Sequence, residues 1–242
     1  MIKVLNSTVP VFGACDDLDI CGYNADCTVS AALSNTVSDD CTPENLLVVD
    51  FKIDLDNDGT YDLIGANVSP YPYPNPNGMP ILPVAYTDLG TGEYEITIGS
   101  YDFPIGTHRI LWNAEDKCSN VGTCEYLFDA QDCAKPTPKA FHGLAVDIQP
   151  VTNAVTVTAM MMDAGSFDNC CLAANPFRIA SPSGGPGQTT PPNSTQVVFG
   201  CNDLGSQSVD LWVQDCNGNW DYVTSYVNVQ NNMAARTVAG AN

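Results

Sequence analysis

The stretch FPIGTHRILWNAEDKCSN, Phe103–Asn120, decides the fold of this chain. Apolar side chains occupy every second position from Ile110 to Ala114, and polar side chains such as Arg109 and Asn113 lie between them. Successive side chains of a β-strand point to opposite faces, so this alternation predicts a strand with one face in a core. Turn residues on both sides of the strand predict that it belongs to a hairpin.

The same pattern is written a second time at Leu204–Asn219, which reads LGSQSVDLWVQDCNGN. The two copies align at a constant offset of 99 residues, which pairs Asp116 with Asp215 and Asn120 with Asn219. A period near one hundred residues is typical of immunoglobulin-like sandwiches arranged in tandem. The sequence therefore predicts an all-β protein with two tandem immunoglobulin-like β-sandwich modules.

The positions of the two copies and of a proline-rich segment between them divide the 242 residues into four parts. The segment CAKPTPK contains two prolines and separates the two copies of the pattern, as a short, semi-rigid linker does. We expect a first β-sandwich over 1–132, this Pro-rich linker over 133–139 and a second sandwich over 140–231. The last part, 232–242, is expected to be a tail or the start of another linker.

Charge excludes two classes of partner. The chain carries eight Lys plus Arg against 28 Asp plus Glu, which gives a formal net charge of −20. Nucleic acids and anionic membranes both require a basic surface, so neither is an expected partner. No stretch is apolar over the length that membrane insertion requires.

Eleven cysteines are many for this length, and none is spaced as CxxC. Such usage favours a disulfide framework over zinc sites and indicates a compartment outside the cytoplasm. The expected pairs, which spacing alone does not fix, are Cys15–Cys124, Cys41–Cys118, Cys21–Cys27, Cys170–Cys201 and Cys171–Cys216. Cys133 is left over in the linker, either as a bridge to another chain or module or as a free thiol.

Alternating acidic residues at Asp54–Asp62 form the candidate metal site. The segment reads DLDNDGTYD, and carboxylates spaced in this way around a glycine turn can converge on Ca²⁺. The expected ligands are Asp54, Asp56, Asp58, Thr60 and Asp62. Position twelve of an EF-hand loop would be Gly65 in place of the usual Glu, and strands flank the segment, so a calcium-binding hairpin is the hypothesis. The alternative is an Asn-Asp-Gly turn with solvated carboxylates.

Tyr71 and Tyr73 lie in the proline-rich segment SPYPYPNPNGMP. Prolines cannot join a central strand, so the segment is expected to be an extended loop or an edge. The two tyrosines have two possible roles: they could contact a ligand such as a sugar, or fold back to cover the sandwich.

Together with PVFGAC upstream and TCEYLF downstream, the opening stretch resembles the hyalin repeat (HYR), an immunoglobulin-like extracellular module. The segments IDLDNDGTYDLIG, AGSFDNC and GCNDLGSQSVDLWVQDCNGNWDYV look like tandem repeats of large Bacteroidetes cell-surface proteins. The resemblance implies a secreted, multi-repeat protein exported by the type IX route, with no catalytic residues.

These observations favour a non-catalytic structural or adhesive region, a stalk or adhesin, on the cell surface. No arrangement of nucleophile and base, no phosphate loop and no paired histidine ligands stand out. One alternative is the subunit of a surface filament or sheath assembled by chain–chain contacts, and a second is a carbohydrate-binding module. Expected partners are other copies or neighbouring repeats of the same protein, glycans or other cell surfaces. The N-terminal segment lacks the apolar region of a signal peptide, so we expect a fragment of a longer precursor.

Overall fold

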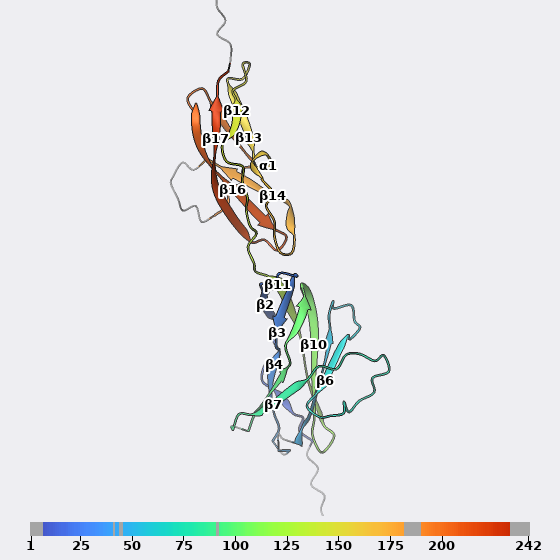
Figure 1. The fold of residues 1–242 in the computed structure, drawn as a ribbon. Helices are drawn as coiled ribbons and strands as arrows, with labels where there is room; N and C mark the ends of the chain where they lie inside the picture. The colour runs from blue at the N-terminus through green and yellow to red at the C-terminus, as the bar shows by residue number, and fades with distance from the viewer. Residues whose placement is uncertain (1–6, 41, 44–45, 91, 182–189, 233–242) are drawn as a thin grey trace, which may run out of the picture. The chain divides into compact units, whose positions relative to one another are not determined.

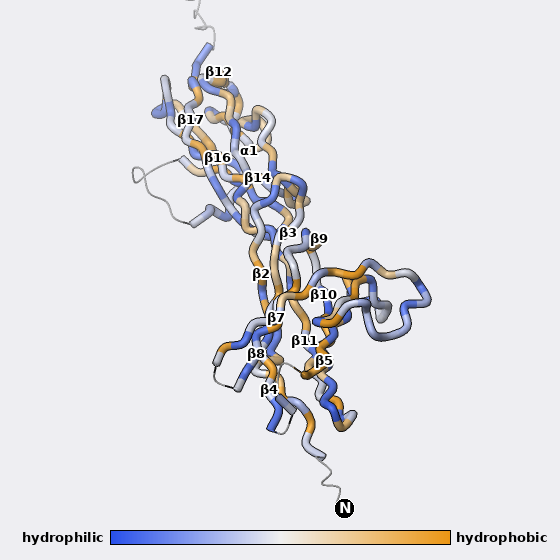
Figure 2. The backbone as a smooth tube through the Cα atoms, turned by 60° about the horizontal axis from the view of Figure 1, so that its bottom comes forward, coloured by the Kyte–Doolittle hydropathy of each residue, from blue (hydrophilic) through white to orange (hydrophobic). Residues whose placement is uncertain are grey.

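Two compact units make up the chain in a computed structural model: unit 1 spans Met1–Asp132 and unit 2 spans Cys133–Asn242. The structure describes residues 7–40, 42–43, 46–90, 92–181 and 190–232. Figure 1 shows that both units are built almost entirely of strands. Hydrophobic and hydrophilic stretches alternate along the chain in both of them (Figure 2).

Unit 1 is a sandwich of a four-stranded and a five-stranded sheet, with a third pair of strands beside them. The four-stranded sheet has the order β1 (Val11–Phe12), β4 (Ser34–Ser38), β8 (Tyr94–Ile98), β7 (Val84–Asp88). The five-stranded sheet has the order β2 (Leu18–Gly22), β11 (Val121–Asp132), β10 (Gly106–Glu115), β5 (Val48–Asp54), β6 (Leu63–Ala66). The remaining pair is β3 (Thr28–Ala31) with β9 (Tyr101–Pro104).

The core of unit 1 forms around Trp112, which is fully buried on β10. Its ring lies 5.7 Å from that of Phe51 on β5, and its Nε1 donates to the hydroxyl of Tyr126 on β11 at 3.3 Å. Ile110 and Ala114 are buried on the same face, as the alternation in the sequence predicts. The inward positions of β10 therefore hold the two sheets together through apolar burial.

Unit 2 is a smaller sandwich built on the same plan. Its main sheet has the order β12 (Leu144–Asp147), β17 (Trp220–Gln230), β16 (Gly205–Asp215), β14 (Leu172–Ala180). The facing sheet is β13 (Ala154–Thr158) with β15 (Gln196–Gly200). One helical turn, α1 (Ala159–Met162), follows β13 and inserts the fully buried Met162 into the core.

Matching topology identifies both units as immunoglobulin-like. In each unit the last two strands form an antiparallel hairpin, β10–β11 or β16–β17. An early strand then pairs in parallel with the last one, β2 with β11 and β12 with β17. The chain is therefore two tandem immunoglobulin-like β-sandwiches.

The turn that closes each hairpin repeats atom for atom. Asp116 accepts hydrogen bonds from the backbone of Cys118 at 2.8 Å and of Asn120 at 2.7 Å, and from the Asn120 side chain at 2.7 Å. Asp215 accepts the equivalent three bonds from Asn217 and Asn219, at 2.9, 2.8 and 2.7 Å. A buried Asp that satisfies the turn explains why Asp and Asn recur in the two copies.

The segment 133–139, expected to be a linker, lies within unit 2. Thr137 exchanges backbone hydrogen bonds with Phe167 at 2.7 and 3.2 Å, and the N–H of Lys139 donates to the Ser166 hydroxyl at 2.9 Å. Pro136 and Pro138 have no N–H group, but Thr137 and Lys139 between and after them do, and both donate to unit 2. The prolines in the sequence predicted a linker and did not show this docking.

Disulfides brace both units. The structure joins Cys15 to Cys124 in unit 1 and Cys171 to Cys216 in unit 2, two of the pairs expected from the sequence. Cys21, Cys27, Cys133 and Cys170 are also disulfide-bonded.

Two cysteine expectations need correction. Cys133 is disulfide-bonded and is not a spare thiol, and Cys201 is an exposed free cysteine, so the Cys170–Cys201 pair is wrong. The two cysteines lie in different surroundings: the Cys170 N–H donates to the Asp168 carboxylate at 2.9 Å, whereas the Cys201 thiol, directly after β15, lies 3.8 Å from the carbonyl of Asn153. The expected Cys41–Cys118 bond involves a residue outside the described part, and Cys118 is an exposed free cysteine.

Candidate functional site

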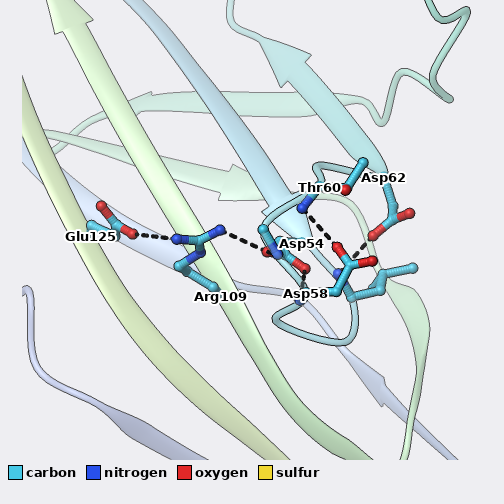
Figure 3. Close-up of polar contacts among 8 residues, drawn as sticks. Asp54, Asp58, Thr60, Asp62, Arg109 and Glu125 are labelled. Atoms are coloured by element: carbon cyan, nitrogen blue, oxygen red, sulfur yellow. Dashed lines mark hydrogen bonds and ion pairs between the residues drawn. The ribbon is translucent and has the colours of Figure 1, made fainter.

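The acidic segment Asp54–Asp62 forms the loop between β5 and β6, two strands that pair antiparallel. Asp54 is fully buried at the end of β5, and its carboxylate accepts the backbone N–H groups of Asp58 at 3.1 Å and Gly59 at 2.9 Å. Asp62 accepts the N–H of Leu55 at 2.8 Å. These carboxylates therefore hold the backbone of the loop in place (Figure 3).

Only part of the expected ligand set comes together. Carboxylate oxygens of Asp54, Asp56 and Asp58 lie within 4.8 Å of one another, and Asp62 is not a member of this group. Thr60 donates its backbone N–H to Asp58 at 2.7 Å. Three convergent carboxylates are fewer than the six to eight oxygen ligands that Ca²⁺ usually takes in proteins.

A cation from the protein itself already contacts Asp54. The guanidinium of Arg109 lies 2.7 Å from the Asp54 carboxylate and 3.3 Å from that of Glu125 (Figure 3). Burial raises the pKa of Asp54, but the hydrogen bonds from Arg109 and from the loop backbone outweigh burial, so its pKa lies below the ordinary value. Asp54 is therefore a paired anion that anchors the loop.

The position of Gly65 explains why the loop lacks the twelfth ligand of an EF-hand. It lies on β6 against Phe51, and a Cβ there would lie 2.4 Å from the Cε1 atom of that ring. The twelfth position faces the hydrophobic core, so a bidentate Glu could not reach a cation in the loop.

His108 is a second residue that the sequence reasoning missed at this loop. It is buried on β10, and its Nδ1 contacts the carbonyl of Leu55 while its Nε2 lies 2.8 Å from the carbonyl of Pro104. His108 and Arg109 therefore fasten the acidic loop to β10 from the two faces of the strand. Their positions directly before the apolar alternation were visible in the sequence, but their partners 53 and 55 residues away were not.

The two tyrosines of the proline-rich segment are half-buried, whereas Pro72 and Pro74 beside them are exposed. The rings of Tyr71 and Tyr73 lie 5.9 Å apart, edge to face, and the Tyr73 hydroxyl donates to Glu115 on β10 at 3.2 Å. Burial, with Asp50 as a second cause, raises the pKa of both tyrosines to about 12. The segment thus lies with its aromatic side against the outer face of the five-stranded sheet.

Comparisons with known proteins identify no family for this chain. No protein-family model matches the chain, and no curated protein does. Among solved structures, Sidekick-1 immunoglobulin domains 1–4 match with a TM-score of 0.46 and 9% identity, over 92% of this chain and 49% of that one. The tandem Ig repeats of Dlar match with a TM-score of 0.29 and 8% identity, over 92% and 98%. Mouse clustered PcdhgC3 EC1-3 matches with a TM-score of 0.39 and 9% identity, over 95% and 70%. At these TM-scores the assignment of the fold rests on the strand order of the chain itself.

Within the described ranges, no helix has the length and apolar character needed to cross a membrane. Eight of the cysteines that the structure describes are disulfide-bonded, which is typical of extracellular and other oxidising compartments and rare in the cytoplasm.

Proposed function

We propose that this chain is a non-catalytic structural and adhesive region of a large bacterial cell-surface protein. The observation that carries the proposal is the repeated hairpin: two immunoglobulin-like units close their last two strands with the same Asp–Asn turn, and each unit is cross-linked by disulfides. The resemblance to tandem repeats of large Bacteroidetes surface proteins supports a bacterial source, and the type IX route is the export route that this source would imply.

A mechanical role follows from the cross-links. The bond Cys15–Cys124 spans 109 residues of unit 1, and Cys171–Cys216 spans 45 residues of unit 2. A chain between bonded cysteines cannot be extended by force, so an unfolding unit would lengthen far less than its residue number allows. Such units in series suit a stalk that must not unravel.

Force spectroscopy on the oxidised chain tests the proposal. The chain is pulled from its two ends, and two separate unfolding events are expected, each with a shortened extension. Reduction should lengthen the extension of unit 1 by roughly 39 nm, because an extended residue spans about 3.6 Å. A chain that extends smoothly without force peaks would contradict a load-bearing role.

We expect the adhesive role to depend on binding between copies of the same protein. Beads coated with the oxidised chain should cluster with one another, and beads coated with an unrelated sandwich protein should not join the clusters. The filament alternative predicts regular polymers under non-reducing electron microscopy, whereas a stalk region stays in separate chains.

A further inference from the structure

A small cavity lies on the outer face of the five-stranded sheet of unit 1, next to the proline-rich segment. Its volume is about 170 Å³. It is lined by Asp50, Lys52, Tyr73, Asn113, Glu115 and Val121. These residues come from three neighbouring strands and from the segment that carries Tyr73, so the cavity is formed by the tertiary structure. We call it the Tyr73 cavity.

A buried carboxylate lies in the Tyr73 cavity. Asp50 is 3% exposed, and its carboxylate accepts one hydrogen bond, from the side-chain amide of Asn113 at 3.1 Å. These two residues are paired in register across β5 and β10. Burial raises the pKa of Asp50, although Asn113 and the charge of Lys52 act in the opposite direction. A carboxylate has about four acceptor sites, so Asp50 has acceptor capacity beyond the bond from Asn113.

The polar groups around Asp50 include both donors and acceptors. Asn113 has a second amide hydrogen, Lys52 is an ammonium donor, and Glu115 accepts from the hydroxyl of Tyr73 at 3.2 Å. The ring of Tyr73 and the half-exposed Val121 add apolar surface to this polar group. A hydroxylated ring with apolar C–H faces has the matching arrangement, because each hydroxyl can donate and accept.

The charges and the volume of the Tyr73 cavity restrict the class of ligand further. The two carboxylates repel an anion, and Lys52 offsets one of the two negative charges that would attract a cation, so we expect a neutral ligand with several hydroxyls in preference to an ion. Pockets for drug-sized ligands measure roughly 300–1,000 Å³, and the smaller Tyr73 cavity suits a single ring. We propose that the Tyr73 cavity binds one neutral sugar residue, with Asp50 and Asn113 on its hydroxyls and Tyr73 against its ring.

This inference goes beyond the structural and adhesive role, which does not depend on it. Nuclear magnetic resonance titration of the oxidised full chain tests it with methyl glucoside, methyl galactoside and methyl mannoside as probes. At least one should shift the side-chain amide signals of Asn113. Glucuronate and glucosamine serve as the anionic and cationic probes, and both should bind more weakly than the neutral one.

Variants locate the binding. Tyr73→Phe keeps the ring but removes the hydrogen bond to Glu115 that holds the ring at the cavity, so it should weaken binding by about two- to tenfold, because a hydrogen bond is worth about 0.5–1.5 kcal/mol. Asp50→Asn keeps the shape and should weaken it as well. Tyr61→Phe is the matched control: Tyr61 does not line the Tyr73 cavity, and Phe keeps the ring over which Arg109 and the cavity residue Lys52 lie, so this variant should bind like the wild type.

Three results would overturn the proposal. One is that no neutral probe shifts the Asn113 signals. Another is that a sugar binds equally well to the Tyr73→Phe and Asp50→Asn variants. The third is preference for glucosamine, which would make the cavity a cation site. A glycan array distinguishes the two possible sources of the sugar, because a free monosaccharide ligand predicts no array signal and a terminal glycan residue predicts one that Tyr73→Phe reduces.

Discussion

Removal of the Cys15–Cys124 disulfide should destabilise unit 1 alone. The bond closes a loop of 109 residues, nearly the whole unit. In the chain-entropy treatment, closure of such a loop lowers the entropy of the unfolded state enough to contribute about 4.8 kcal/mol at 25 °C. Unit 1 spans Met1–Asp132, and unfolding entropy is about 2.1 cal/mol/K per residue, so the loss corresponds to a fall in Tm of about 17 °C.

Differential scanning calorimetry of the oxidised Cys15→Ala/Cys124→Ala variant measures this shift. The second disulfide provides a comparison, because Cys171–Cys216 closes 45 residues and should contribute about 4.0 kcal/mol to unit 2. Cys118→Ala/Cys201→Ala is the matched control, since both residues are exposed free cysteines and their loss should leave both transitions in place.

A fall of less than about 5 °C in the Tm of unit 1 would refute the reasoning, since it is under a third of the fall in Tm that the loop-closure entropy requires. Movement of the unit 2 transition in the Cys15→Ala/Cys124→Ala variant would refute it as well, because the bond lies within unit 1.

Three other perturbations test the turn and the acidic loop. Burial raises the pKa of Asp116, but its hydrogen bonds with Asn120 and Cys118 outweigh burial and leave the pKa lowered. Its contribution to stability is therefore complete above the ordinary Asp value near 4 and is lost as the pH falls below that value through the lowered pKa. Asp116→Asn should flatten the acid side of the Tm–pH curve, and an unchanged curve would contradict this. Ser119 has φ 65° and its counterpart Gly218 has φ 95°, so Ser119→Gly should raise the stability of unit 1 by up to about 1 kcal/mol and Gly218→Ser should lower that of unit 2, as denaturant unfolding measures. Calcium binding at Asp54–Asp62 is an untested hypothesis, and the pairing of Arg109 with Asp54 favours the alternative of a turn without a metal: we therefore expect a chelator to leave the Tm of wild-type unit 1 unchanged, and a fall in Tm that calcium restores would show that a cation completes the loop.

The sequence was most informative where local periodicity matches the final structure. The alternation around Trp112 predicted β10, and its repetition predicted β16 and the two sandwiches. Strands β2, β4 and β7 were missed, since each is only five residues long and the few apolar side chains in it are too few to predict a strand. Short strands of this kind are defined by the neighbour they pair with, which a local pattern does not show.

The sequence predicted where the candidate sites lie, but it did not predict which distant residues contact them. The acidic loop was placed correctly between two strands, but its cation, Arg109, lies 55 residues from Asp54 and reaches it through the register of β5 and β10. Likewise the sequence singled out Tyr73 but did not show that Glu115 and Asp50 lie beside it. Pairings of this length depend on sheet register, which is set by the whole sandwich.

The two copies of the hairpin differ where they face outward. At inward positions Ile110 and Trp112 of unit 1 correspond to Val209 and Leu211 of unit 2, and all four are buried. At an outward position, however, the cavity residue Asn113 corresponds to Trp212, which stacks on Tyr222 with ring centroids 4.6 Å apart.

On β10, residues that maintain the fold therefore alternate with residues that could bind a ligand. Alternate residues of β10 face the core and maintain the fold, so they tolerate only apolar exchange between the copies. The residues between them face outward, contribute little to the core and are free to diverge. A sugar site formed by Asp50, Asn113 and Tyr73 should therefore belong to unit 1 alone, because a stacked tryptophan takes the place of the Asn113 amide in unit 2. Exchange of Asn113 for Trp should abolish sugar binding and leave the Asp116 turn and the core of unit 1 folded, as the calorimetric transition would show.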